Sequence, residues 1–163
     1  MPIYDKKIVD THEQLYRLSC IPSCVEIILK LSNLVPVSYY DQQHLWKNKR
    51  DGSFSDYDNK EIEGLLFSRQ FAHARGNEFP LQELFQTVEA ELKENRYVAV
   101  SIANASGWHM YIIYDIDTTG NFLSVSKNHK DTIYQDSMLT GSVKGAVSAM
   151  RGTDILTYTT KNP

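Results

Sequence analysis

The chain has 163 residues, of which 42% are hydrophobic. This length supports one well-buried core and is short for two, so we expect a single domain over residues 1–163. The 17 basic and 20 acidic side chains are scattered and give a formal net charge of −3, which disfavours nucleic acid or an anionic membrane as a partner. No apolar run approaches the roughly 20 residues that span a bilayer, and the first residues lack the apolar segment of a secretory signal. We therefore expect a cytoplasmic protein, or a secreted effector that leaves by a non-classical route.

The chain has two cysteines, Cys20 and Cys24. They are too few for a disulfide framework, and no second Cys/His pair stands at the spacing of a structural zinc site. We therefore expect reduced thiols and neither a metal nor a cofactor.

The first predicted helix begins at Cys20. Ser19 is a suitable N-cap residue, and apolar positions such as Val25 and Ile28 lie at helical spacing until Ser32. The segment QLYRLSCIPSCVEIILKL, residues 14–31, therefore predicts a buried helix with a cysteine at its start.

Three further segments precede the expected sheet. Residues 34–59 are polar, aromatic and turn-rich, and the loop from Ser38 to Asn59 within them either walls a substrate cleft or forms ordinary surface. Residues 59–76 predict a helix with an acidic first turn that ends near Gly76. Residues 79–96 predict a helix with Pro80 at its start. Its apolar stripe is Leu81, Leu84, Phe85, Val88 and Leu92.

From residue 97 the period changes to that of β-strands, which are rich in β-branched and aromatic residues. Strands are predicted over 97–103, 108–116 and 121–128, with weaker signals over 131–136 and 154–160, and the pattern of residues 141–152 assigns no element. Helices followed by strands indicate an α+β fold in which the central Cys-bearing helix packs on a C-terminal antiparallel sheet.

Cys20 is the candidate nucleophile. Unpaired N–H groups at a helix N-terminus lower a thiol pKa, whereas Cys24, one turn later, is expected to be buried and to serve packing. The alternative for Cys20 is that it also fills the core, since free cysteine is among the most buried residues.

His109 is the candidate base, because it begins an apolar strand directly after a Ser-Gly turn. If a two-residue turn joins the strands, His109 pairs with Asn128, whose side-chain amide can orient the imidazole. If Gly120 makes a three-residue turn, the register shifts by one and His129 takes that place. Asn128 is preferred because an amide oxygen accepts the imidazole N–H better than a second imidazole does. Gln14, six residues before Cys20, can supply an oxyanion donor together with the Cys20 N–H.

The order of Gln14, Cys20, His109 and Asn128 resembles the papain-like cysteine peptidase superfamily. Within it, Q-x5-C-I-P-S-C-x2-I-I-L is similar to the bacteriocin-processing, double-glycine-leader peptidase group, whose motif reads Q-x5-C-G-x-A-[CS]-x2-M-I-L. The resemblance implies a papain-like fold, with Gln14 as oxyanion donor, Cys20 as nucleophile, His109 as base and acid, and Asn128 where the group usually has Asp. Ile21 replaces the group's Gly, and its Asp-Pro after the His strand is absent.

The sequence thus favours a Cys-His-Asn hydrolase of peptide or amide bonds, with a peptide or protein as substrate. A glutamine deamidase or a transglutaminase-like acyltransferase uses the same chemistry. The other classes are a catalytically inactive papain-like binding module and an unrelated α+β domain whose cysteines both fill the core.

Overall fold

The computed structural model describes residues 1–104, 107–129, 136–137 and 142–160. Its centre is a seven-stranded sheet of order β1-β2-β7-β3-β4-β5-β6, and every neighbouring pair is antiparallel. The strands are β1 (Lys60–Ile62), β2 (Leu65–Gln70), β3 (Val98–Asn104), β4 (Gly107–Ile116), β5 (Phe122–Lys127), β6 (Asp136–Ser137) and β7 (Ile155–Thr160).

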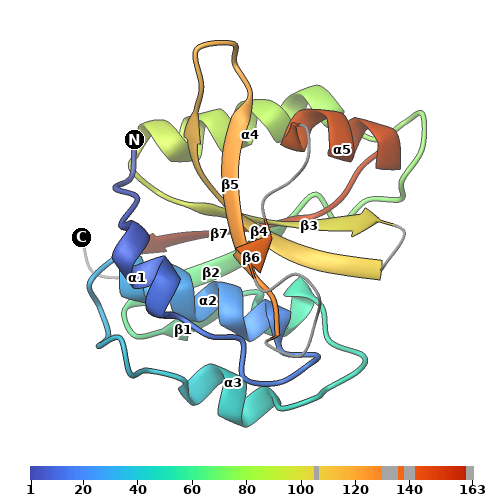
Figure 1. The fold of residues 1–163 in the computed structure, drawn as a ribbon. Helices are drawn as coiled ribbons and strands as arrows, with labels where there is room; N and C mark the ends of the chain where they lie inside the picture. The colour runs from blue at the N-terminus through green and yellow to red at the C-terminus, as the bar shows by residue number, and fades with distance from the viewer. Residues whose placement is uncertain (105–106, 130–135, 138–141, 161–163) are drawn as a thin grey trace.

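Helices cover both faces of this sheet (Figure 1). One face carries α4 (Leu81–Lys93) and α5 (Val143–Met150), and the other carries α2 (Cys20–Leu31) with α1 (Lys6–Thr11) and α3 (Asp41–Trp46) against it. A short 3-10 helix, η1 (Phe54–Tyr57), follows α3 and contacts β2. The predicted α+β class is confirmed, and no helix in the described ranges is long and apolar enough to cross a membrane.

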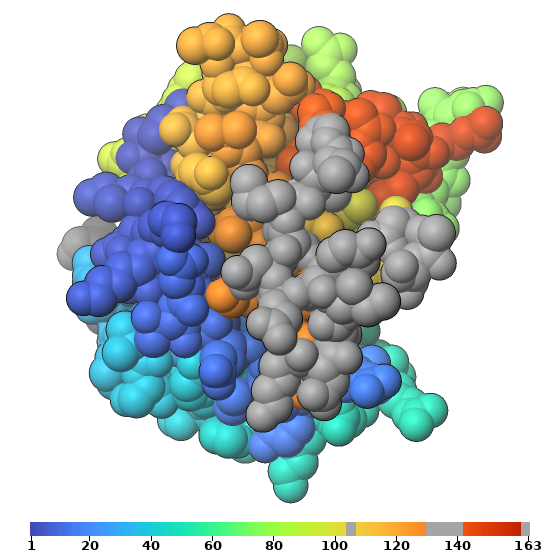
Figure 2. Space-filling model, in the orientation of Figure 1, coloured from blue at the N-terminus to red at the C-terminus, as the bar shows by residue number. Residues whose placement is uncertain are grey.

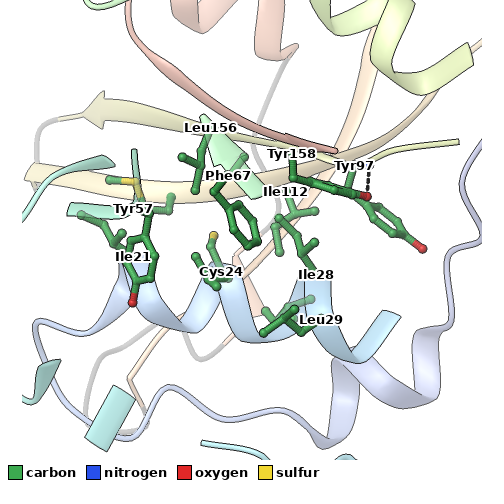
Figure 3. Close-up of a cluster of buried hydrophobic side chains, with 14 of the residues drawn as sticks. Ile21, Cys24, Ile28, Leu29, Tyr57, Phe67, Tyr97, Ile112, Leu156 and Tyr158 are labelled. Carbon is green, nitrogen blue, oxygen red and sulfur yellow. Dashed lines mark hydrogen bonds between the residues drawn. The ribbon is translucent and has the colours of Figure 1, made fainter. Parts of the chain in front are cut away.

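The central helix α2 begins at Cys20 and ends at Leu31, as predicted, and eleven of its 12 residues are buried. Its Ile21, Cys24 and Ile28 point toward the sheet, where they meet Phe67 and other apolar side chains (Figure 3). The polar side of α2 is buried as well, because α1 and α3 cover it. The expectation of a central Cys-bearing helix packed on an antiparallel sheet is therefore confirmed.

The helix predicted over 59–76 is wrong, because the segment forms β1 and β2. Glu63 and Gly64 both have positive φ, 52° and 92°, and they join Ile62 to its strand partner Leu65. Two central residues with positive φ make the turn that suits a tight hairpin. The buried residues Leu65 and Phe67 then alternate along β2, with the period of a strand.

The segment predicted as a loop over 34–59 contains α3 and η1. Ser53 and Asp56 form a capping box around η1, and the rings of Trp46 and Tyr57 stack at a centroid distance of 6.0 Å. Local capping and aromatic contacts thus order a segment whose composition alone suggested turns.

The helix predicted over 79–96 is confirmed as α4, which buries Leu84, Val88 and Leu92. The unassigned segment 141–152 contains α5, which begins after Ser142, whose hydroxyl accepts from the Gly145 N–H at 2.9 Å. These two helices and the residues of β3 and β4 that face them form a second core.

The hairpin predicted over 108–128 is confirmed as β4 and β5, and its tip protrudes from the top of the molecule in Figure 2. Near the tip Ile116 pairs with Phe122, whereas beyond an irregularity at Tyr114 Ile112 pairs with Val125. The register therefore changes by one along the hairpin, so that each predicted register holds over one part of it. The strand predicted over 131–136 lies outside the described residues except for residue 136.

Candidate active site

Cys20 is the first residue of α2 and its side chain is half-buried against the core between α2 and the sheet. Burial raises the pKa of its thiol to about 11, although hydrogen bonds from the backbone N–H groups of Cys20 and Ile21 oppose that rise. The opposing contribution comes from the first backbone amides of α2, as expected at a helix N-terminus. The thiol is nevertheless protonated at neutral pH, so attack on a carbonyl requires a base that removes its proton.

Cys24 is buried in the same core, and burial raises its thiol pKa well above the usual value. Its side chain points toward the sheet in Figure 3, which agrees with the packing role predicted for it.

Gln14 lies in the loop that leads to Cys20. Its side-chain Nε2 donates to the backbone oxygens of Tyr16, at 2.9 Å, and Arg17, at 3.1 Å. Both amide hydrogens are therefore used within the loop, while the buried Oε1 has no hydrogen-bond partner. In this arrangement Gln14 does not offer the oxyanion donor that the sequence predicts, and one of these bonds must break before it can.

His109 lies on β4, and the alternation of this strand places it away from α2. Met110 and Ile112 belong to the core that packs on α2, whereas Tyr111 belongs to the core under α4 and α5. The His109 ring contacts the Tyr111 ring, with centroids 5.6 Å apart, so it shares the face of Tyr111. The predicted pair is therefore not assembled, and no hydrogen bond joins Cys20 to His109 in the described part of the chain.

The orienting group of His109 is also different from the prediction. A hydrogen bond to the backbone of Lys127 engages the His109 ring, whose Nε2 is buried without a partner. Burial lowers the pKa of His109 to about 4, so the ring is neutral. Asn128 follows directly after β5, and continuation of the Ile112–Val125 register places it opposite His109. The hydrogen bond that orients the His109 ring thus goes to the Lys127 backbone.

His129 lies closer to the Cys20 loop than the sequence suggested. Its backbone bridges to Gln14, and 9% of the residue is exposed. Val125 packs in the α2 core, and Lys127 lies near enough to His12 to lower its pKa, so the odd residues here face α2. His129 continues this alternation. Figure 1 shows the end of β5 running toward the N-terminal half of α2, which β5 contacts.

A buried polar network on the other side of α2 was not predicted. It comprises His12, Ser19, Ser23, Glu26, Lys30 and Gln43, each at most 2% exposed. The spacing of Ser23, Glu26 and Lys30 shows a polar stripe on one side of the helix. A polar stripe of this kind is ordinarily the solvent-exposed side of a helix. Here it is buried because α1 and α3 pack against it.

Among the residues that the structure describes, no group of three or more His, Cys, Asp or Glu side chains is placed to hold a metal ion. A hollow of about 640 Å³ is lined by Leu31, Ser32, Tyr97, Tyr158 and others. It lies at the C-terminal end of α2 and is therefore remote from Cys20.

The arrangement can thus present a thiol at a helix N-terminus, next to a loop whose Gln14 backbone bridges to that of His129 after β5. Comparison of the chain with protein-family models and with curated proteins finds no match.

Proposed function

We propose that the chain is a papain-like cysteine hydrolase that cleaves peptide or amide bonds, with Cys20 as its nucleophile. The observation that carries the proposal is the position of this thiol. It is half-buried at the first residue of an otherwise buried helix, where the first backbone N–H groups of the helix oppose the rise of its pKa on burial. A thiol at this position can act as a nucleophile once a base removes its proton.

In the proposed reaction, an imidazole takes the Cys20 proton and the sulfur attacks the substrate carbonyl. In this proposal the backbone N–H of Cys20 donates to the developing oxyanion, and Gln14 joins it if one of its loop hydrogen bonds opens. The imidazolium then protonates the leaving amine, which leaves a thioester. Water hydrolyses the thioester, releases the acid and restores the thiol.

Two imidazoles are candidates for this proton transfer. The resemblance supports His109, which begins its strand as in papain-like peptidases, with Asn128 beside it. His129 is supported by its backbone bridge to Gln14 and by the strand alternation that turns Val125 toward the α2 core, which, continued to residue 129, turns His129 the same way. Assignment to His109 requires the start of β4 to rearrange so that its ring reaches the thiol.

The test is reaction of the purified chain with 4-nitrophenyl acetate, a small acyl donor, followed by mass spectrometry. We expect a burst of 4-nitrophenolate, an acetyl group on Cys20, and no burst from Cys20→Ala. His109→Ala and His129→Ala are compared with His73→Ala, which changes an exposed histidine. The variant that loses the burst identifies the base, while His73→Ala should retain it. A folded wild-type chain without acetylated Cys20 refutes the proposal.

The second candidate is an inactive papain-like binding module. It is favoured by the separation of His109 from Cys20 and by the engagement of both Gln14 amide hydrogens. Selective alkylation of Cys20 by iodoacetamide without any acyl burst supports this module, because alkylation needs only an exposed thiol that can ionise and no oxyanion donors.

A further inference from the structure

We propose that Gln43 is a positioning residue that holds the Gln14–Cys20 loop in the geometry needed for acyl transfer. This inference rests on the proposed function. Gln43 lies on α3, is completely buried, and is not adjacent in sequence to any residue of the site. A buried side-chain amide lowers the stability of the fold unless each of its polar groups makes a hydrogen bond.

The Gln43 side chain uses both of its polar groups fully. Its Oε1 accepts from the backbone N–H of Leu15 and from the Ser19 hydroxyl, both at 2.7 Å. Its Nε2 donates to the backbone oxygen of Glu13 at 2.8 Å and to Glu26 Oε1 at 2.7 Å. These four hydrogen bonds use both amide hydrogens and both oxygen lone pairs of Gln43. They also determine which atom of the amide is the oxygen and which is the nitrogen.

Three of these four bonds reach the loop on either side of Gln14. Glu13 and Leu15 are its immediate neighbours, and Ser19 immediately precedes Cys20. Ser19 occupies the N-cap position of α2, but its side chain makes no capping hydrogen bond. Its hydroxyl instead lies between Gln43 and the Tyr16 backbone. The entry to the helix is therefore fixed from α3.

The fourth bond ties the loop to the central helix. Glu26 accepts from the backbone N–H of Gln43 at 2.9 Å as well as from its side chain. Glu26 is itself completely buried on α2, about 1.7 turns beyond Cys20. Gln43 thus holds the Gln14–Cys20 loop and helix α2 in a fixed relative position. Small displacements of catalytic groups lower the rate of catalysis.

The test compares two reactions of Cys20. Acylation by 4-nitrophenyl acetate depends on placed oxyanion donors, whereas alkylation by iodoacetamide depends on exposure and ionisation of the thiol. In Gln43→Glu, a carboxylate replaces the Nε2 donor next to Glu26. We expect the ratio of acylation to alkylation rate to fall by about 10²-fold. Buried Cys24 should stay unalkylated, which shows that the fold is intact.

Two further variants make the result specific. Glu26→Gln combined with Gln43→Glu exchanges donor and acceptor without changing the net charge. It should recover part of the ratio, because it restores the bond between residues 26 and 43 while the Glu13 carbonyl still lacks its donor. Gln42→Glu is the matched control, because Gln42 bonds to Tyr39 and Tyr57 and not to the loop. It should keep the wild-type ratio.

An unchanged ratio in Gln43→Glu overturns the proposal. So does an equal fall in Gln42→Glu, or alkylation of Cys24 in step with Cys20 in both Gln43 variants, because Gln43 then supports the whole fold and not the loop. If wild-type Cys20 is not acylated at all, the proposed function fails. If it is acylated and Gln43 has no effect, only this inference fails.

Discussion

Replacing Lys30 by methionine tests the cost of a charge buried on the central helix. Lys30 is 1% exposed, and its Nζ lies 2.9 Å from His12 Nδ1 and 3.8 Å from the centre of the Tyr40 ring. Burial lowers the Lys30 pKa from the usual 10.5 to about 8, against the opposing attraction of Glu26. The folded state therefore loses the Lys30 proton at lower pH than the unfolded state does.

The sign of the pH effect follows from this difference. Between about pH 8 and 10.5 the unfolded chain binds more protons at Lys30, so the contribution of Lys30 to stability rises with pH. The pKa difference corresponds to a gain of about 2.5 kcal/mol between pH 7 and pH 10. Lys30→Met abolishes this gain. Glu26 increases the difference between wild type and Lys30→Met. Without the Lys30 cation, the Glu26 carboxyl ionises less readily in the folded variant.

The measurement is the free energy of unfolding by urea, for wild type and Lys30→Met, at pH 7 and pH 10. We expect the wild type to gain at least about 2.5 kcal/mol relative to the variant over this interval. Taking the difference between the two proteins cancels the tyrosines and cysteines that also titrate there. Parallel pH profiles of the two proteins refute the reasoning, because Lys30 then has the same pKa folded and unfolded.

Three other changes have defined outcomes. Cys24→Ser should lower the unfolding free energy by about 1–3 kcal/mol, since it places a hydroxyl in an apolar core, while Cys20 acylation persists; equal loss of acylation in folded Cys24→Ser and Cys20→Ala contradicts these roles. Gly152→Ala should lower the melting temperature, because φ is +124° and the new Cβ would lie 2.3 Å from the Phe79 ring; an unchanged melting temperature would contradict both the backbone strain and the clash. Gln14→Ala should slow Cys20 acylation by about 10²-fold or more if Gln14 supplies an oxyanion donor. An unchanged acylation rate assigns the oxyanion to the backbone alone.

Local patterns predicted much of the fold. The start of α2, the buried stripe of α4 and the β4–β5 hairpin each follow from the periodicity of one segment. The segment 59–76 misled because Glu63 adopts a positive φ that its residue type does not signal, so the hairpin turn went unrecognised.

The candidate site was predicted less completely, because it depends on how distant segments pack. Sequence analysis singled out Cys20 and its place at a helix N-terminus, and the structure agrees. It did not foresee the irregularity at Tyr114, nor that His109 would share the face of Tyr111. Gln43 carried no local signal, since a glutamine in a polar segment is ordinarily a surface residue.

The two edges of the sheet bear on how the protein behaves at high concentration. The edge strands β1 and β6 span three and two residues, and the exposed residues of β1 include Lys60 and Glu61. Short, charged edges offer few free backbone groups to another sheet and so oppose intermolecular strand pairing. Removal of β1 would leave β2, a six-residue strand with buried Leu65 and Phe67, as an exposed edge strand that can pair with another chain. The β1–β2 hairpin, which the sequence analysis did not predict, therefore opposes aggregation through strand pairing.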